Sequence, residues 1–199
     1  MIAFMCMLIG CLGGCFDNEN DKPEETAVAA PEPWSPSWET CSYTIDDHAC
    51  DFTLVDQNGN PWTLYGDDNR GDIILIDLSA MWCGPCKLAA AEAQEIHDLY
   101  KDKGFQYVTI LIDDAQGEAP DAADALSWAQ QYNISSAPVL LGSRDNVDYS
   151  GENGFPTTSW PTFLLIDRNL VVRWGLHGYS RQMIEEAITT LINEPDTAE

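Results

Sequence analysis

Basic residues are scarce in this chain. Its 199 residues include nine Lys and Arg against 33 Asp and Glu, which gives a formal net charge of −24 at pH 7. A field of this sign repels the phosphate backbones of DNA and RNA, so we exclude nucleic acid as a partner. The high negative charge itself is explained by solubility and indicates no particular ligand.

Metal-ligand patterns are scarce as well. The chain has one C-x-x-C motif, at Cys83 and Cys86, and no second one to complete a tetrahedral zinc site. The other cysteines and histidines beyond the N-terminal segment do not show the spacing of zinc ligands: Cys41, His48, Cys50, His97 and His177. We therefore favour a redox role for the motif over half of a zinc site, and we predict no metal and no cofactor.

The C-x-x-C motif lies between an apolar run, residues 73–78, and an alanine-rich stretch, residues 87–100, that favours a helix. At a helix start, Cys83 is close to unpaired backbone N–H groups and to the positive end of the helix dipole, which both stabilise a thiolate. Cys86 lies one turn further, where it can attack a mixed disulfide formed by Cys83. Pro85 suits a first helical turn. The pattern predicts a site of disulfide exchange.

This region also resembles a known family. Residues 74–86 read Ile-Leu-Ile-Asp-Leu-Ser-Ala-Met-Trp-Cys-Gly-Pro-Cys and are similar to the active-site strand and turn of the thioredoxin superfamily. The likeness runs from about Asp51 to about Ile192 and is strongest to the extracytoplasmic branch typified by TlpA and ResA. It implies a thioredoxin-like α/β fold with an N-terminal β-hairpin extension and a central helix–strand insertion.

The resemblance implies roles for further residues. Asp77 takes the place of an acid buried behind the cysteine pair. Trp82 is a large aromatic beside the cleft, which either shields one flank of the pair or only packs there. Pro161 matches a cis-proline that faces the cysteines; Pro156 is a competing candidate, but Pro161 leads directly into an apolar strand. The chain departs from thioredoxin in one respect: the strand at residues 107–112 has no lysine near the buried acid.

Hydrophobic periodicity and turn signals predict the order of the elements. A mixed sheet between helices, three layers in all, follows from that order. The expected strands are 51–55, 62–64, 73–79, 105–112, 138–141, 163–167 and 170–174, and the expected helices are 87–100, 121–132 and a last one capped by Ser180.

The N-terminus indicates targeting. We expect residues 1–15 to be a signal or lipoprotein segment, with an uncleaved apolar tail as the alternative. Residues 1–12 are largely apolar, lack Lys and Arg and are too short to span a bilayer, and two lipobox-like sequences end at Cys11 and Cys15. Acylation of Cys15 leaves four cysteines, hence two pairs, whereas use of Cys11 leaves an odd thiol, so we favour Cys15. The second pair, Cys41 and Cys50, is then a structural disulfide. Residues 16–40 form an acidic, proline-rich linker, and 41–199 the thioredoxin-like domain.

We therefore expect an enzyme, a thiol-disulfide oxidoreductase held by a lipid anchor at the extracytoplasmic face of a membrane. Its expected partners are proteins that carry disulfides and a membrane electron donor. Two alternatives stay open: a thiol peroxidase of the peroxiredoxin kind, although Met81 and Trp82 do not supply the Pro and Thr or Ser that its cysteine needs, and a binding lipoprotein of the same fold without catalysis.

Overall fold

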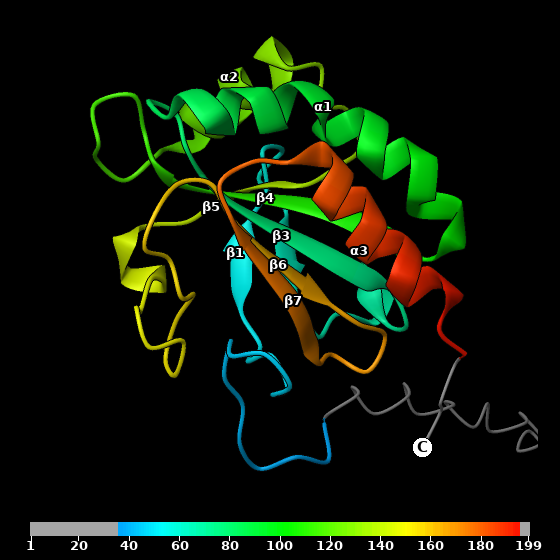
Figure 1. The fold of residues 1–199 in the computed structure, drawn as a ribbon. Coiled ribbons are helices and arrows are strands. Elements are labelled where there is room, and N and C mark those ends of the chain that lie inside the picture. The colour runs from blue at the N-terminus through cyan, green and yellow to red at the C-terminus, as the bar shows by residue number, and fades with distance from the viewer. Residues whose placement is uncertain (1–35, 196–199) are drawn as a thin grey trace, which may run out of the picture. The chain divides into compact units, whose positions relative to one another are not determined.

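The central sheet of the computed structural model, which describes residues 36–195, has five strands in the order β5-β4-β3-β6-β7 (Figure 1). Strands β3 (Ile73–Ala80), β4 (Phe105–Asp113) and β5 (Val139–Leu141) run parallel to one another. Strands β6 (Thr162–Ile166) and β7 (Val172–His177) run antiparallel to their neighbours. The mixed sheet that the sequence predicts is confirmed.

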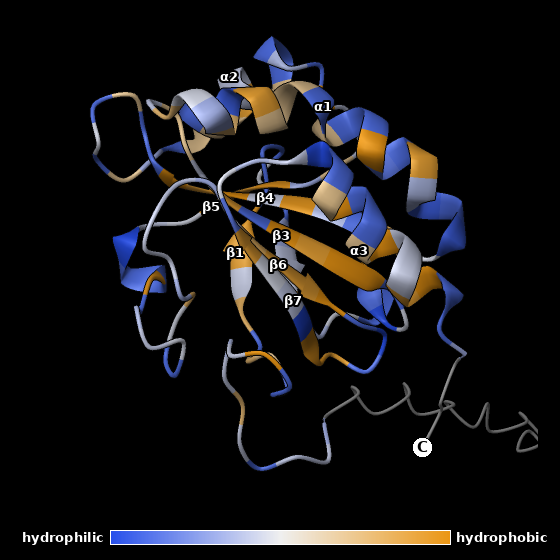
Figure 2. Cartoon of the chain, viewed as in Figure 1, coloured by the Kyte–Doolittle hydropathy of each residue, from blue (hydrophilic) through white to orange (hydrophobic). Residues whose placement is uncertain are grey.

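Strand β3 is buried along its whole length, as is most of β4, which explains why both are nearly continuous apolar runs. Figure 2 shows this as a hydrophobic band through the middle of the sheet. Alternate side chains face opposite sides. Ile73 and Leu75 pack into one core, and Ile74 and Ile76 pack into the other.

All three α-helices contribute to the same core, on one face of the sheet (Figure 1). They are α1 (Gly84–Tyr100), α2 (Ala122–Gln131) and α3 (Arg181–Asn193). The face of α1 that meets the sheet is rich in alanine. These small side chains let the helix lie close to the sheet, with the C-x-x-C motif at the start of α1. The structure also has short 3₁₀ turns at η1 (Asp67–Asn69), η2 (Lys101–Lys103) and η3 (Arg144–Asn146).

The opposite face differs from the expectation of helices on both sides. In the part of the chain that the structure describes, it is covered by the hairpin β1 (Thr53–Val55) and β2 (Pro61–Thr63) and by loops that insert Tyr43 and Phe155. The loop before the hairpin is bonded to the sheet edge through its backbone, Ala49 N–H to Leu170 O at 2.8 Å and Val172 N–H to Asp47 O at 2.9 Å. These backbone hydrogen bonds hold the loop against the sheet. Within residues 36–195, the hairpin and the loops therefore form the third layer in place of an α-helix.

Two boundary predictions need correction. Strand β7 begins at Val172, because Asp167 to Leu170 form a tight turn in which the Asp167 carboxylate accepts the N–H groups of Asn169 and Val171, both at 2.9 Å. Ser180 precedes α3, but its side chain makes no capping hydrogen bond.

Trp38, counted with the linker in the sequence, packs on the domain. Its ring stacks on His48 with centroids 3.8 Å apart, and its Nε1 donates to the Tyr65 hydroxyl at 3.2 Å. The lipobox cysteines, Cys11 and Cys15, lie outside the described residues. Among the helices of residues 36–195, none has the length and apolar character needed to cross a bilayer.

Candidate active site

The C-x-x-C motif lies at the turn from β3 into the first turn of α1. Cys83 is the N-cap residue of α1 and is joined to Cys86 by a disulfide with a Cα–Cα distance of 5.3 Å. The Cys86 backbone N–H donates to the Cys83 Sγ at 3.1 Å. Pro85 occupies the first turn, where its missing N–H costs no hydrogen bond. A thiolate on Cys83 would therefore sit at the positive end of a 17-residue helix with a donor already aimed at it.

Both cysteines are well covered in this oxidised form. Cys83 is 4% exposed and Cys86 is 0% exposed, so Cys83 is the more accessible of the two by a small margin only. The sequence predicts a partly exposed Cys83. Part of the difference has a simple cause: in the disulfide one side of the Cys83 sulfur is covered by the Cys86 sulfur to which it is bonded.

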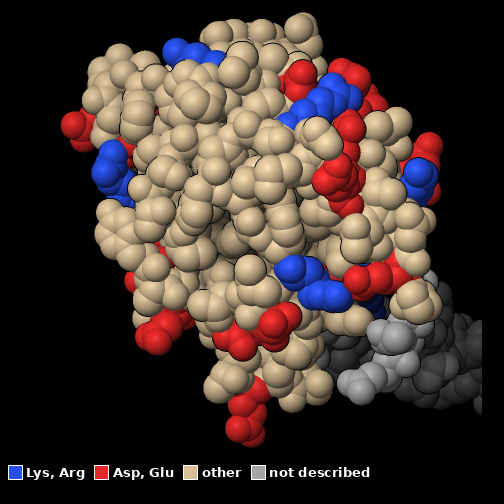
Figure 3. All heavy atoms as spheres, viewed as in Figure 1, with Lys and Arg blue, Asp and Glu red and all other residues tan. Residues whose placement is uncertain are grey.

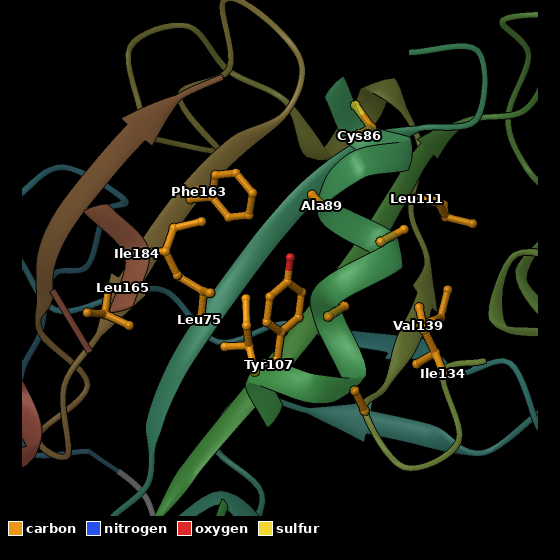
Figure 4. Close-up of a cluster of buried hydrophobic side chains, with 14 of the residues drawn as sticks. Leu75, Cys86, Ala89, Tyr107, Leu111, Ile134, Val139, Phe163, Leu165 and Ile184 are labelled. Atoms are coloured by element: carbon orange, nitrogen blue, oxygen red, sulfur yellow. The ribbon is translucent and has the colours of Figure 1, made fainter. Parts of the chain in front are cut away.

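Asp77 lies in β3, fully buried on the face that packs against α1. Its two carboxylate oxygens accept hydrogen bonds from the Ser79 hydroxyl at 2.7 Å and from the Tyr107 hydroxyl at 2.9 Å. Figure 4 shows the Tyr107 hydroxyl pointing into the space between β3 and α1, below Cys86 and Ala89. Burial raises the pKa of Asp77 to about 7, and the two hydrogen bonds offset only part of that rise.

Tyr107 thus stands beside the buried acid in a chain that has no lysine on this strand. The sequence reasoning missed it, because a tyrosine in an apolar strand gives no signal beyond core packing. Burial, with the nearby Asp77 as a second cause, raises the pKa of Tyr107 well above its usual value. The hydroxyl therefore acts as a neutral donor to Asp77.

Pro161 directly precedes β6, the strand that pairs with β3. The Trp160–Pro161 peptide bond is cis, and no other cis bond occurs in residues 36–195, Pro156 included. The Gly178 N–H donates to the Pro161 carbonyl at 2.8 Å. Because Thr162 pairs with Leu78 near the end of β3, the proline lies at the same end of the sheet as the dithiol.

His177, opposite Thr162 on β7, is a second residue that the sequence reasoning did not place. The Thr162 hydroxyl donates to the Ser159 carbonyl at 2.7 Å, so it is left to accept from His177 Nδ1, 3.0 Å away. The hydrogen bonds therefore fix the ring orientation and put the proton on Nδ1. Only the strand register could reveal this pair.

Trp82 is 46% exposed beside Cys83. Its indole Nε1 donates to Asp113 Oδ2 at 3.1 Å, at the end of β4, and Arg144 from η3 pairs with the same carboxylate. The sequence shows Asp113 only as the end of a strand. Since the carboxyl ends of β3 and β4 meet at one edge of the sheet, its approach to Trp82 follows from the parallel pairing.

The second disulfide joins Cys41 and Cys50, with a Cα–Cα distance of 4.9 Å. It closes the loop that covers the sheet face away from the helices. In the described part of the chain, no three His, Cys, Asp or Glu side chains are grouped as metal ligands would be. On the face that Figure 3 shows, Lys and Arg form small patches beside Asp and Glu and no continuous basic surface.

Comparison with known proteins agrees with this geometry. The model of the AhpC/TSA family matches residues 45–175. Thioredoxin of Mycoplasma genitalium is 34% identical over 82 residues, 41% of this chain and 69% of that protein. The thiol-disulfide oxidoreductase ResA of Oceanobacillus iheyensis is 30% identical over 73 residues, which are 36% of this chain and 38% of ResA.

Two solved structures are similar in fold. One is a thiol:disulfide interchange protein, DsbE, from Chlorobium tepidum, with a TM-score of 0.58 and 27% sequence identity. The superposition includes 75% of this chain and 99% of the DsbE chain. The exposed lipoprotein thioredoxin of Streptococcus pneumoniae has a TM-score of 0.58 and 23% identity, with 71% of this chain and 100% of its own covered. With the family match and the dithiol at the start of α1, the chain belongs to the AhpC/TSA family and is a thioredoxin-like thiol-disulfide oxidoreductase.

Proposed function

We propose that this protein reduces disulfides in extracytoplasmic proteins and that a membrane electron donor recharges it. The Cys83 thiolate attacks one sulfur of a substrate disulfide, forms a mixed disulfide and releases the first substrate thiol. The Cys86 thiolate then attacks the Cys83 sulfur and releases the second. Two electrons pass to the substrate, and the protein is left with its Cys83–Cys86 disulfide.

The observation that carries this proposal is the position of Cys83. Its sulfur lies at the N-terminus of α1 and accepts the Cys86 N–H at 3.1 Å, so its thiolate is stabilised before any substrate binds. Cys86, one turn inside and fully buried, has no access to a large substrate and is suited to the resolving step.

Asp77 is proposed to take the proton of Cys86. A carboxyl with a pKa of about 7 can accept a proton near neutral pH and release it again, which an ordinary aspartate does poorly. Its place on the α1 side of β3, behind the motif, supports this role. Pro161 is proposed to keep a backbone edge open for an extended substrate segment, and Trp82 to shield one flank.

The direction of electron flow is tested by the redox potential of the Cys83–Cys86 pair. The Gly84-Pro85 dipeptide between the cysteines is that of thioredoxin, for which about −270 mV is typical. Equilibration with a dithiothreitol or glutathione buffer, read by alkylation, should give a value near this. A potential near about −120 mV, as in DsbA, would make the protein an oxidant and reject the reductase proposal.

An extracytoplasmic, lipid-anchored location is also part of the proposal. It is supported by the lipobox ending at Cys15, by the Cys41–Cys50 disulfide, which suits an oxidising compartment, and by the fold it shares with an exposed lipoprotein. Labelling with a radioactive fatty acid should mark the full chain and the Cys11→Ser variant and leave Cys15→Ser unlabelled. Label retained in Cys15→Ser would move the anchor to another cysteine or reject it.

The two alternative functions have direct assays. A thiol peroxidase would consume hydrogen peroxide at the expense of a thiol donor, and we expect this protein to show no such turnover above the uncatalysed rate. A binding lipoprotein without catalysis would fail to accelerate the reduction of insulin by dithiothreitol. We expect clear acceleration.

A further inference from the structure

One buried carboxylate next to the dithiol has no part in the mechanism above. The Asp113 side chain is 1% exposed at the end of β4. It accepts from Arg144 Nε at 2.9 Å, from Arg144 Nη2 at 2.6 Å and from Trp82 Nε1 at 3.1 Å. Its backbone carbonyl accepts the Met81 N–H at 3.0 Å. Asp113 thus holds the two residues that immediately precede Cys83.

Arg144 reaches this site from the segment between β5 and β6, and its backbone is fixed. The turn η3 that it begins is closed by a capping box, in which Ser143 Oγ accepts the Asp145 N–H at 3.2 Å and the Ser143 N–H donates to Asn146 Oδ1 at 2.8 Å. The preceding Gly142 lies so close to β4 that a Cβ there would come within 2.6 Å of Ile110. The guanidinium is thus presented from a rigid base.

We propose that Arg144 is a positioning residue for the exchange reaction: its two-pronged pairing with Asp113 keeps that carboxylate in place, and Asp113 in turn holds Trp82 at the flank of the dithiol. The inference deepens the disulfide-exchange function and rests on it. A carboxylate buried without its cation is costly, so it draws in water or turns outward. Either change weakens the hydrogen bond from Trp82 Nε1 to Asp113, and the half-exposed indole is then held less firmly in its orientation.

The geometry of arginine matters here. The Nε and Nη2 groups meet the two carboxylate oxygens as a fork, an arrangement that the single ammonium of lysine cannot reproduce. The Arg144 side chain is 66% exposed, so it fills no cavity and its replacement leaves the core intact. A loss of activity on substitution would therefore report on Asp113 and Trp82 and not on packing.

The test compares Arg144→Gln, Asp113→Asn and the double variant with the wild-type chain in insulin reduction. We expect kcat/KM to fall about tenfold in each single variant, the size of one lost hydrogen bond to a charged group. Because both act on the same contact, the double variant should be no worse than the poorer single variant. Asp113→Asn preserves the shape of the side chain and decides the matter if Arg144→Gln is poorly folded.

Two controls separate positioning from general damage. Arg70→Gln breaks an ion pair with Asp67 before the start of β3, at the other end of the strand, and should stay within about twofold of wild type. Trp82→Phe identifies the part of the tryptophan fluorescence that changes when the Cys83–Cys86 disulfide is reduced. That part should be lost or reversed in Arg144→Gln and retained in Arg70→Gln.

The outcomes are distinct. Wild-type kcat/KM and an unchanged Trp82 signal in Arg144→Gln and Asp113→Asn would overturn the inference, as would additive losses in the double variant. If the wild-type chain itself did not reduce insulin, the exchange function would fail instead.

Discussion

The two disulfides of this chain differ in a way that exposure does not explain. Cys41 is exposed and Cys50 is partly buried, whereas Cys83 and Cys86 are almost fully covered. Accessibility alone would make the Cys41–Cys50 bond the reactive one. The surroundings of the sulfurs indicate the opposite.

The difference lies in what a freed thiolate would find. Cys83 begins α1 and receives a backbone N–H on its sulfur, so the reduced form is stabilised by the helix. None of the hydrogen bonds within residues 36–195 ends on the sulfur of Cys41 or Cys50. Their loop is held to β7 by backbone bonds instead, so it stays folded around the bond it contains. The more reactive disulfide is thus the one whose reduction releases the better stabilised thiolate.

The largest expected effect is on activity. Cys83→Ser removes the attacking sulfur, and we expect insulin reduction to fall by more than about a thousandfold, because the nucleophile has no substitute. The double variant Cys41→Ser/Cys50→Ser should retain activity within about twofold. Equal losses in both would show that the two bonds are not functionally distinct.

Asp77 gives the next largest effect. Its folded-state pKa of about 7 exceeds the unfolded value of 3.8. The folded state therefore binds the proton more tightly, and the contribution of Asp77 to the free energy of unfolding falls as the pH rises from about 4 to about 7. Asp77→Asn cannot ionise, so we expect it to be about 4 kcal/mol more stable than wild type at pH 8, at 1.36 kcal/mol per pKa unit.

At pH 4 the two proteins should differ by less than about 1 kcal/mol, since Asp77 is then protonated in the fold. Urea unfolding at both values measures this. The same variant should resolve mixed disulfides more slowly, as Asn cannot take the Cys86 proton. A stability gain that does not depend on pH would contradict the assigned ionisation.

The Cys41–Cys50 bond should matter to stability alone. It closes a short loop, with a sequence separation of 9, and by loop entropy its removal costs about 2–3 kcal/mol. Chemical unfolding of Cys41→Ser/Cys50→Ser at pH 7 measures the loss. Stability equal to wild type would mean that the backbone bonds to β7 hold the loop without the sulfur bridge.

Tyr107→Phe gives the smallest change. It removes one of the two hydroxyl donors of Asp77 and leaves Ser79, so the carboxylate is less well stabilised and the pKa of Asp77 should rise by about one unit. The pH midpoint of the activity profile should move upward by the same amount. A profile that does not move would indicate that Asp77 is not the group that titrates.

The local parts of this architecture could be predicted from the sequence. The apolar run of β3, the alanine stripe of α1 and the turn signals of the first hairpin each depend on near neighbours, and the elements lie within a few residues of the expected positions. What covers the far face of the sheet could not be predicted, because that depends on where the loop at residues 41–50 attaches. Only the bonds of Ala49 and Asp47 to the β7 edge decide it.

The same division holds at the site. The positions of Cys83, Cys86 and Asp77 follow from one continuous segment. Other strands and loops bring three more residues to the site: Tyr107, Asp113 and Arg144. Their local sequence does not predict this position. A tyrosine in an apolar strand, an acid at a strand end and an arginine in a polar loop are each ordinary until strand pairing brings them together.

The stacking of Trp38 on His48 fixes where the chain enters the domain. His48 forms a bridge with Val171 in the β6–β7 turn, beside the start of β3, and the dithiol follows the end of that strand. Eight residues of extended chain place these ends about 25 Å apart. The chain therefore enters the described domain at the end of the sheet opposite the dithiol, so an attachment through the N-terminal segment, as proposed above, leaves the reactive end open to visiting proteins.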